Sequence, residues 1–230
     1  MSQLTDRLLG EPDSRAATNA LLAEVRAGRW GPRAWVRFLA DATRRSVHQA
    51  RRHPRALAEV TALHVLFAVL ADRRGRAWVA VSWGMAASHL GLLEQRSSIG
   101  LASTITLARA NLPALAGGRW VSGLALGSDL ADGWLARGLG AESRFGAAAD
   151  SLADAAFWTW FTLRHEPSHR VRAMALLAWL APVVAVTAAS ARQGSMVDAP
   201  RPVVLRPAAA LQAVLTARGI FSSTSTPRYD

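Results

Sequence analysis

A series of apolar segments fills most of the chain after residue 55 and constrains the fold more than any other feature. Short charged or Gly/Pro-containing stretches separate seven such segments, at 56–71, 77–93, 99–117, 120–135, 145–163, 171–191 and 203–217. A helix needs about 20 apolar residues to cross a bilayer, and about 17 at the lower limit, so most of these segments are marginal alone. Seven of them together would leave a soluble protein too little polar surface. We therefore expect an all-α integral membrane bundle of about six transmembrane helices.

The composition limits the chemistry that the chain can perform. Cysteine is absent, which excludes disulfide scaffolds, thiolate metal sites and cysteine nucleophiles. The net charge of +11 is typical of proteins that bind nucleic acid or an anionic membrane surface. Nine tryptophans and a mean hydropathy of +0.14 favour the membrane. We expect membrane lipids as partners and no nucleic acid.

The first 55 residues differ from the rest of the chain. They carry 11 arginines and a net charge of +6, and their helical pattern places Trp35 and Phe38 among arginines such as Arg33 and Arg37. This pattern is typical of an amphipathic helix that lies on an anionic leaflet. A basic helix that packs on its own protein has the same pattern, so both interpretations stay open. The region shows no signal-peptide pattern, and we expect it on the cytoplasmic side.

These patterns divide the chain into four expected parts. Residues 1–55 would form a cytoplasmic or interfacial amphipathic helical region, and residues 56–96 would form an additional hydrophobic helical hairpin. Residues 97–221 would form the membrane core. The Ser/Thr-rich residues 222–230 would form a disordered tail, because they have too few apolar side chains to pack.

Four aspartates in the core carry the expected chemistry. Asp129 and Asp132 stand at i and i+3 of one expected helix, and Asp150 and Asp154 stand at i and i+4 of the next. A turn over residues 138–144 allows the two helices to run antiparallel with their acids facing each other. Each unpaired carboxylate inside a membrane costs at least about 2.5 kcal/mol, so acids in such surroundings indicate a functional site.

The acids and their small neighbours predict a metal and a phosphorylated substrate. A ligand set of carboxylates alone suits a hard divalent ion such as Mg²⁺ or Mn²⁺, which completes its coordination with substrate phosphates. A diphosphate substrate follows. Gly133, Ala136 and Gly146 remove side-chain bulk beside the acids, so that a substrate group can approach the helix backbone. Arg137, one turn after Gly133, could neutralise a phosphate.

The spacing of these residues resembles a known family. Residues 129–154 read D-x2-D-G-x2-A-R-x8-G-x3-D-x3-D, which is similar to the signature of the CDP-alcohol phosphatidyltransferase family at every specified position. Upstream, Ser103, Thr106 and Arg109 resemble that family's first core helix, which usually carries asparagine in place of the serine. The resemblance covers residues 97–195 and is weaker towards the C-terminus. It implies a metal-dependent membrane enzyme that moves a phosphatidyl group from a CDP-linked donor, such as CDP-diacylglycerol, to an alcohol acceptor, with release of CMP.

The resemblance also implies a role for each matching residue. Asp129, Asp132 and Asp150 would bind two metal ions, and Asp154 would be the general base that deprotonates the acceptor hydroxyl and would also touch a metal. The residues that line the cytidine diphosphate site would be Thr106, Arg109, Gly133, Ala136, Arg137 and Gly146. Members of this family are commonly homodimers. The small-residue motif Gly123-x3-Gly127 would permit the close helix contact that a homodimer needs, and it serves internal packing equally well.

The sequence leaves the acceptor alcohol open. Arg109, Arg144 and Arg192 could bind a phosphorylated acceptor, which favours glycerol 3-phosphate or inositol phosphate. Ser151 stands where the family's glycerophosphate enzymes often carry proline, which weakens the first of these two choices.

The expected orientation follows from the donor. A CDP-linked donor carries a cytosolic nucleotide, so we expect the active site to face the cytoplasm from the cell membrane. This orientation leaves Arg164, Arg170 and Arg172 on the outer side, against the positive-inside tendency.

Two other functions stay open. Mg²⁺-dependent membrane prenyltransferases also use paired acidic motifs, but those motifs usually lie farther apart than the 18 residues that separate Asp132 from Asp150. A non-catalytic basic membrane-binding protein would use the arginine-rich region instead. Substitution of Asp150 or Asp154 distinguishes an enzyme from such a binding protein, because the function of the binding protein would not change.

Overall fold

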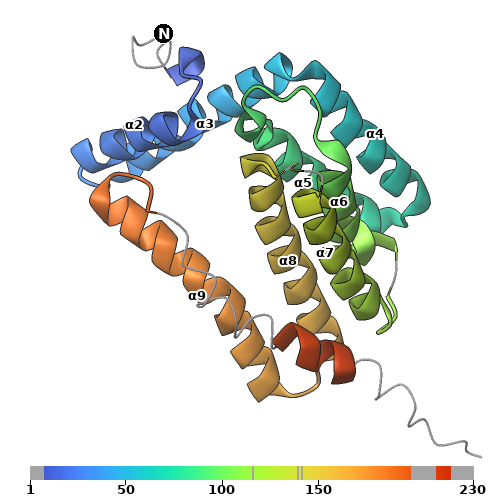
Figure 1. Cartoon of the computed structure of the whole chain (residues 1–230). Helices are drawn as coiled ribbons and strands as arrows, with labels where there is room; N and C mark the ends of the chain where they lie inside the picture. Colours follow the sequence, from blue (N-terminus) through green and yellow to red (C-terminus); the bar gives the residue numbers. More distant parts are fainter. Residues whose placement is uncertain (1–7, 116, 139, 141, 198–210, 219–230) are drawn as a thin grey trace, which may run out of the picture.

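All regular structure is helical in the residues that the computed structural model describes, which are 8–115, 117–138, 140, 142–197 and 211–218 (Figure 1). The elements are α2 (Ser14–Ala27), α3 (Pro32–Arg52), α4 (Pro54–Leu70), α5 (Arg73–Ser88), the 3-10 helix η1 (Leu90–Leu93), α6 (Gly100–Leu115), α7 (Val121–Gly138), α8 (Arg144–His165) and α9 (His169–Gln193). A short helix over 211–218 follows. The expected all-α class is confirmed. The predicted tail 222–230 and the first half of the predicted segment 203–217 lie outside the described residues.

Side-chain caps determine where several helices begin. The Ser143 hydroxyl accepts a hydrogen bond from the Gly146 amide (2.9 Å) at the start of α8, and Asp72 accepts one from the Gly75 amide (2.6 Å) at the start of α5. Proline begins α3 and α4, where its missing N–H costs nothing. The cap on α8 is the one nearest the site, because it fixes where the helix that carries Asp150 and Asp154 begins.

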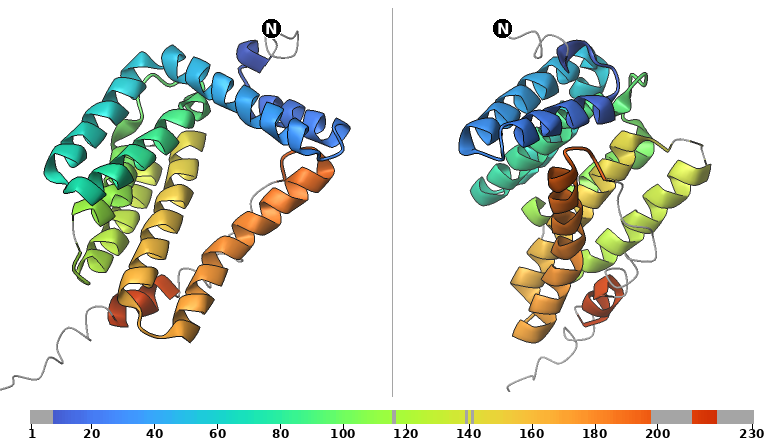
Figure 2. Two further views of the ribbon diagram at one scale, coloured as in Figure 1. Left: turned by 180° about the vertical axis from the view of Figure 1, so that it is seen from behind. Right: turned by 90° about the vertical axis from the view of Figure 1, so that its left-hand side faces the viewer.

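Helix α6 lies at the centre of the core. It packs along α7 and α8 on one side and against α5 and α4 on the other (Figures 1 and 2). Helix α9 stands apart from this group, with α8 near its beginning and α2 near its end. At that end Arg26 donates a hydrogen bond to the Gln193 carbonyl (3.0 Å). The central position of α6 brings side chains from three helices to a common point.

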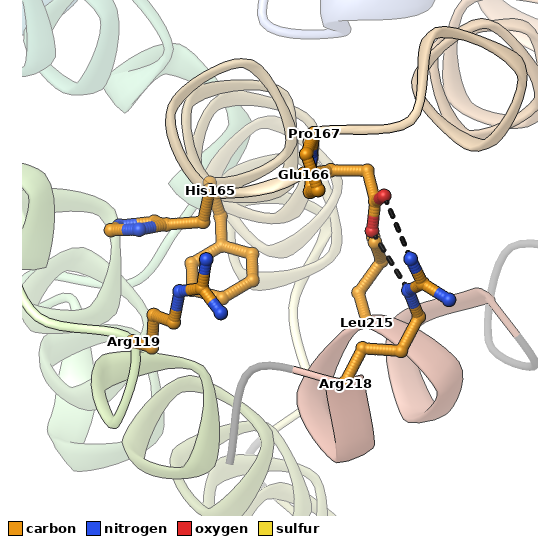
Figure 3. Close-up of a pocket in the computed structure, with 7 residues that line it drawn as sticks. Arg119, His165, Glu166, Pro167, Leu215 and Arg218 are labelled. Carbon is orange, nitrogen blue, oxygen red and sulfur yellow. Dashed lines mark hydrogen bonds and ion pairs between the residues drawn. The ribbon is translucent and has the colours of Figure 1, made fainter. Parts of the chain in front are cut away.

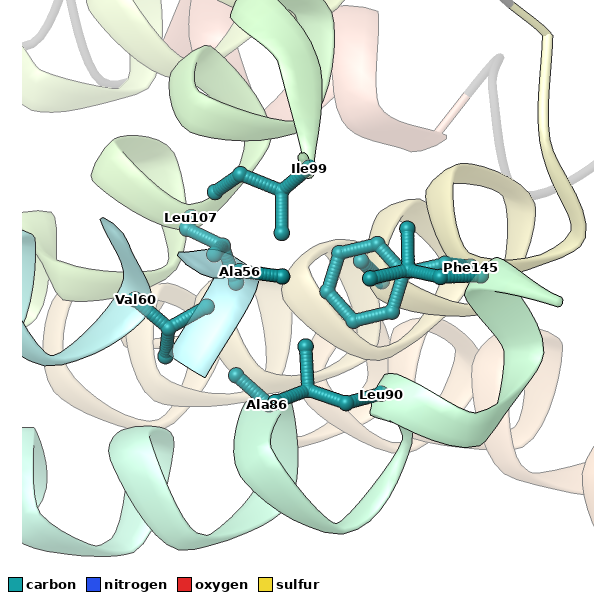
Figure 4. Close-up of a cluster of buried hydrophobic side chains, with 9 residues drawn as sticks. Ala56, Val60, Ala86, Leu90, Ile99, Leu107 and Phe145 are labelled. Atoms are coloured by element: carbon teal, nitrogen blue, oxygen red, sulfur yellow. The ribbon is translucent and has the colours of Figure 1, made fainter. Parts of the chain in front are cut away.

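Two apolar clusters hold the two ends of α8. Near its beginning, Phe145 packs with Val60, Leu90 and Leu107 in a cluster that joins it to α4, η1 and α6 (Figure 4). Near its end, an aromatic group within residues 157–161 packs against α7, α9 and the short C-terminal helix. The middle turns of α8, which carry two of the predicted site acids, are therefore fixed from both sides.

Within the described residues, α9 is the one helix that has both the length and the apolar composition to cross a membrane. Helices α6, α7 and α8 coincide with three other predicted spans and contain 16, 18 and 22 residues. The expected bundle of about six transmembrane helices therefore remains a proposal. Large apolar side chains are nevertheless exposed along α4, α7 and α9, among them Val69, Leu130, Trp134, Leu177 and Val184. Such a surface is typical of helices that face lipid or another protein chain.

The basic amino-terminal region forms a helical hairpin of α2 and α3. Phe38 of α3 packs on the cluster that contains Leu21 of α2. On the other side of α3, Val36 and Leu39 are 66% and 61% exposed. One face of α3 thus packs on its own protein, and a second apolar face remains available to a membrane surface.

Helix α5 approaches α6 closely at Gly75. A Cβ atom on Gly75 would clash with the Ala114 carbonyl oxygen, a backbone atom that cannot turn aside. One turn further along, Trp78 Nε1 donates a hydrogen bond to the Ala110 carbonyl (2.8 Å). The missing side chain at position 75 therefore sets the distance at which α5 supports α6.

We expect Gly75→Ala to lower the stability of the fold by about 1–3 kcal/mol, because the added methyl group would push α5 away from α6. Gly84→Ala in the same helix is the matched control. Apart from the neighbouring backbone of α5, no described atom lies within 4 Å of a Cβ atom at Gly84, and alanine is the better helix former. Thermal unfolding in detergent should show a lower Tm for Gly75→Ala and an unchanged or higher Tm for Gly84→Ala. An unchanged Tm for Gly75→Ala would contradict the close approach.

Candidate active site

Arg109 of α6 lies at the centre of four aspartates. Its Nη1 is 3.0 Å from Asp132 Oδ2 and 3.4 Å from Asp129 Oδ1, which both come from α7. From α8, Asp150 accepts a hydrogen bond from Arg109 Nη2, and Asp154 Oδ1 lies 3.2 Å from Arg109 Nε. The Arg109 side chain is fully buried. All four predicted acids therefore share one cation.

Two neutral side chains orient the acids. Thr106, one turn before Arg109 on α6, donates a hydrogen bond to Asp132 Oδ2 (2.6 Å). Gln212 of the short C-terminal helix donates one to Asp154 Oδ2 (3.2 Å). Because neither side chain carries charge, four ionised carboxylates against one guanidinium would leave three negative charges uncompensated. An excess of this size in a partly buried cluster favours the binding of further cations.

The cluster fits a divalent metal ion. Oxygen atoms of Asp129, Asp132 and Asp150 all lie within 4.8 Å of one another. Asp154 stands outside this group of three. Its buried Oδ1 accepts no hydrogen bond from the described residues, so it could serve as a further ligand. Carboxylate oxygens without sulfur or imidazole are the ligands that Mg²⁺ and Mn²⁺ prefer. The donor set therefore suits the ions that the sequence predicts, with Asp154 at the edge of the group.

A cleft of about 480 Å³ lies beside the acid cluster. Its walls contain two of the acids and four of the residues predicted to bind the nucleotide: Asp132, Asp150, Thr106, Gly133, Ala136 and Gly146. A Cβ atom on Gly146 would lie 3.2 Å from Ser143 Oγ and 3.5 Å from Ser103 Oγ. Small side chains on α6, α7 and α8 thus keep the cleft open next to the carboxylates.

The other two predicted nucleotide-binding residues do not line this cleft within the described part of the chain. Arg109 is enclosed by the acids. Arg137 turns back along α7, where its Nη1 lies 3.2 Å from the position that a Cβ atom on Gly133 would take. A direct contact of either guanidinium with a nucleotide in the cleft would need a change of side-chain conformation.

The arginines considered for acceptor binding lie in three different places. Arg109 belongs to the acid cluster, as described above. Arg144 lines the cleft and forms ion pairs with Glu94 (3.0 Å) and Asp13 (3.6 Å). Arg192 is exposed near the end of α9 that packs against α2. Arg144 is therefore the one of the three that the structure places at the cleft.

Sequence reasoning missed two features of this site. Gln212 lies 58 residues after Asp154 and belongs to no motif, so nothing in the sequence signalled its contact with that acid. The central position of Arg109 had a signal, because Arg109 lies one turn after Thr106 and both residues face the same side of α6. Whether Arg109 pairs with the acids or with a nucleotide depends on tertiary packing, which the sequence pattern does not give.

We expect Arg109→Gln to destabilise the metal-free protein by about 3–5 kcal/mol, because removal of one partner leaves buried charges uncompensated. Divalent ions should compensate for this loss. In thermal unfolding, Mg²⁺ should raise the Tm of Arg109→Gln by more than it raises the Tm of the unaltered protein. Arg137→Gln, the same change on an exposed side chain, should behave like the unaltered protein. Equal Tm values for the two variants in chelator would contradict the role of Arg109 as counter-ion.

Comparison with known proteins identifies the family to which this site belongs. The family model described as CDP-alcohol phosphatidyltransferase matches residues 105–217, from within α6 to the short C-terminal helix. Comparisons with curated proteins and with solved structures gave no match. Members of the matching family are integral membrane proteins that transfer a phosphatidyl group from a CDP-alcohol, typically with a divalent metal. Residues 105–217 of this chain, which contain the whole acid cluster and its cleft wall from α7 and α8, belong to the CDP-alcohol phosphatidyltransferase family.

Proposed function

We propose that the protein is a membrane phospholipid-synthesising transferase, which moves a phosphatidyl group from a CDP-linked donor such as CDP-diacylglycerol to an alcohol acceptor and releases CMP. The observation that carries this proposal is the cluster of four aspartates at the edge of an open cleft. A diphosphate is a suitable occupant because its charge complements bound divalent ions, whereas the acids alone would repel it.

The cleft supports binding of the cytidine diphosphate part of the donor. Gly133 and Gly146 expose helix backbone on two of its walls, and Asp132 and Asp150 lie at the boundary with the acid cluster. The nucleotide would occupy the cleft, with its diphosphate next to these two acids. Mg²⁺ or Mn²⁺, which we propose as two ions held by Asp129, Asp132 and Asp150, would neutralise the diphosphate and the leaving CMP when bound.

Asp154 is suited to accept the proton of the acceptor hydroxyl. As the acceptor oxygen bonds to the phosphatidyl phosphorus, the bond from that phosphorus to the oxygen that leaves with CMP breaks, and the hydroxyl proton passes to Asp154. Arg109 lies 3.2 Å from Asp154 Oδ1, and Gln212 donates to Oδ2 over the same distance. The hydrogen bond to Oδ2 and the nearby guanidinium hold the carboxylate in one orientation, and Oδ1, which accepts no hydrogen bond within the described residues, can take the proton.

Arg144 supports a phosphorylated acceptor, such as glycerol 3-phosphate or inositol phosphate. Its side chain is 60% exposed at the cleft, with Glu94 3.0 Å away. A phosphate group could replace this carboxylate as the partner of the guanidinium without leaving a buried charge behind.

Several surface features support a place in the cell membrane, and we propose that the cleft faces the cytoplasm because CDP-linked donors present their nucleotide there. Helix α9 has the composition of a membrane span, and apolar side chains are exposed on α4, α7 and α9. On α7, a Cβ atom on Gly123 or Gly127 would meet no described atom within 4 Å apart from the neighbouring backbone of α7 itself. These two residues therefore leave room for a second copy of the chain, as a homodimer requires.

The direct test measures CMP release. Membranes that contain the protein, incubated with CDP-diacylglycerol, Mg²⁺ and a panel of alcohols, should release CMP with at least one acceptor. Excess chelator should abolish the release, and Mg²⁺ or Mn²⁺ should restore it. Asp150→Asn should be inactive, and Asp41→Asn on α3 is the control for the same chemical change at a remote site. Full turnover in chelator would rule out the metal-dependent reaction.

Asp154→Asn separates proton transfer from donor binding. We expect turnover to fall by roughly 10²–10⁴-fold, because the amide cannot accept the proton. Binding of CDP-diacylglycerol should be retained better than in Asp129→Asn, since Asp154 lies at the edge of the group of three close acids. Equilibrium binding of labelled donor to both purified variants provides the comparison. If both variants lose donor binding equally, Asp154 is chiefly a metal ligand.

A further inference from the structure

Helix α3 has a second apolar face that packing within the chain does not explain. Phe38 packs towards α2 and Arg45 is buried, so this side of the helix faces its own protein. Val36, Leu39 and Val47 lie on the opposite side of the helix and are between 46% and 66% exposed. They stand at i, i+3 and i+11, which is one face of a helix, and we call them the apolar stripe of α3.

A row of arginines runs along one flank of the apolar stripe. The row consists of Arg33, Arg37, Arg44 and Arg51, which are all exposed. At about 100° per residue these four side chains leave the helix within about 40° of one another, and at 1.5 Å per residue the row is about 27 Å long. Arg44 forms an exposed ion pair with Asp41 (3.2 Å). The row contains three more arginines when this pair is set aside.

The hairpin of α2 and α3 is strongly basic as a whole. Residues 14–52 contain nine arginines and two acids, Glu24 and Asp41, so an excess of positive charge remains even if each acid pairs with an arginine. Such a surface attracts an anionic partner. Because the charge lies beside exposed apolar side chains, the partner must offer apolar surface next to its anionic groups. An anionic bilayer has this combination, with acyl chains directly beneath the phosphates, and a nucleic acid does not.

The hairpin is attached to the chain where a membrane surface would lie. Helix α9, which can cross a membrane, ends at Gln193, and Arg26 of α2 donates a hydrogen bond to the Gln193 carbonyl (3.0 Å). Just beyond α9, the Met196 amide donates to Asn19 Oδ1 of α2 (2.7 Å). Figures 1 and 2 show that α2 and α3 run across this end of α9 and not along it. Helices that cross the end of a membrane span have the direction of interfacial helices, which lie in the plane of the membrane.

We propose that the apolar stripe and the arginine row of α3 dock the amino-terminal hairpin onto an anionic phospholipid leaflet. The stripe would enter the boundary between headgroups and acyl chains, and the arginines would pair with lipid phosphates. The row would provide the selectivity for anionic lipid, since each arginine near such a surface strengthens binding by roughly fivefold. The proposal concerns the hairpin and does not depend on the transferase activity.

Fluorescence quenching by lipid provides the test, because the cysteine-free chain can be labelled at a single chosen position. Leu39→Cys carries the fluorophore in the stripe, and Arg52→Cys carries it at an exposed position on the other side of α3 as the matched control. Each full chain is reconstituted into phosphatidylcholine vesicles, with or without phosphatidylglycerol, that contain a lipid with a quencher on its acyl chain. We expect strong quenching at position 39 with phosphatidylglycerol, weak quenching without it, and little quenching at position 52.

Removal of charge from the arginine row tests the selectivity. Arg37→Gln and Arg51→Gln, added together to Leu39→Cys, should raise the fraction of phosphatidylglycerol needed for the same quenching, because two attractive charges are lost. The control adds Arg73→Gln and Arg74→Gln instead, which removes the same charge from exposed positions at the start of α5. This control should respond to phosphatidylglycerol as Leu39→Cys alone does.

Quenching at position 39 that depends on phosphatidylglycerol and on the arginine row supports the proposal. Equal quenching at positions 39 and 52, quenching without dependence on phosphatidylglycerol, or equal behaviour of the row variant and its control overturns it. Absence of lipid quenching at position 39 also overturns it, and iodide in the water phase then shows whether the stripe faces water or a second protein chain. If circular dichroism shows that the row variant does not fold, the two kinds of vesicle still decide, since that comparison needs only Leu39→Cys.

Discussion

One buried guanidinium connects the three central helices. Arg109 is the cation on α6, and all four of its acidic partners come from α7 and α8. The pairs can form only if α6 lies next to both helices, so the electrostatics and the packing require the same arrangement. Arginine is suited to this position because its planar group offers five donors and stays charged when buried. The chain contains no lysine, which has neither property.

The polar cluster is stable at this depth because apolar packing surrounds it. Phe145 anchors the beginning of α8, and the aromatic group within residues 157–161 anchors its end. Asp150 and Asp154 lie between these anchors, so apolar packing holds the backbone of α8 on both sides of the acids. The aromatic group also separates the acid cluster from the ion pair between Glu166 and Arg218, which lies beyond the end of α8 (Figure 3).

The sequence predicted the parts of the structure that depend on local patterns. The expected segments 99–117 and 145–163 correspond to α6 and α8 within a few residues, because apolar periodicity and the Ser143 cap act over short distances. The spacing of the four aspartates likewise sufficed to expect that they face one another. The contact between Gln212 and Asp154 was not predictable, since it joins segments with no shared pattern. The number of membrane spans was ambiguous for a related reason: segments of 16–18 residues occur both in lipid and in protein cores.

The short C-terminal helix connects Asp154 of the acid cluster to Glu166 beyond the end of α8. Gln212 at its beginning bonds to Asp154, and Arg218 at its end bonds to Glu166. These two residues lie about 9 Å apart along a helix of two turns, which moves as a rigid body. If a small change in hydrogen-bond length moved Arg218 by about 1 Å, Gln212 would therefore move by a similar amount. The alignment of a carboxylate deep within the protein thus depends on an ion pair that lies beyond the end of the helix that carries it.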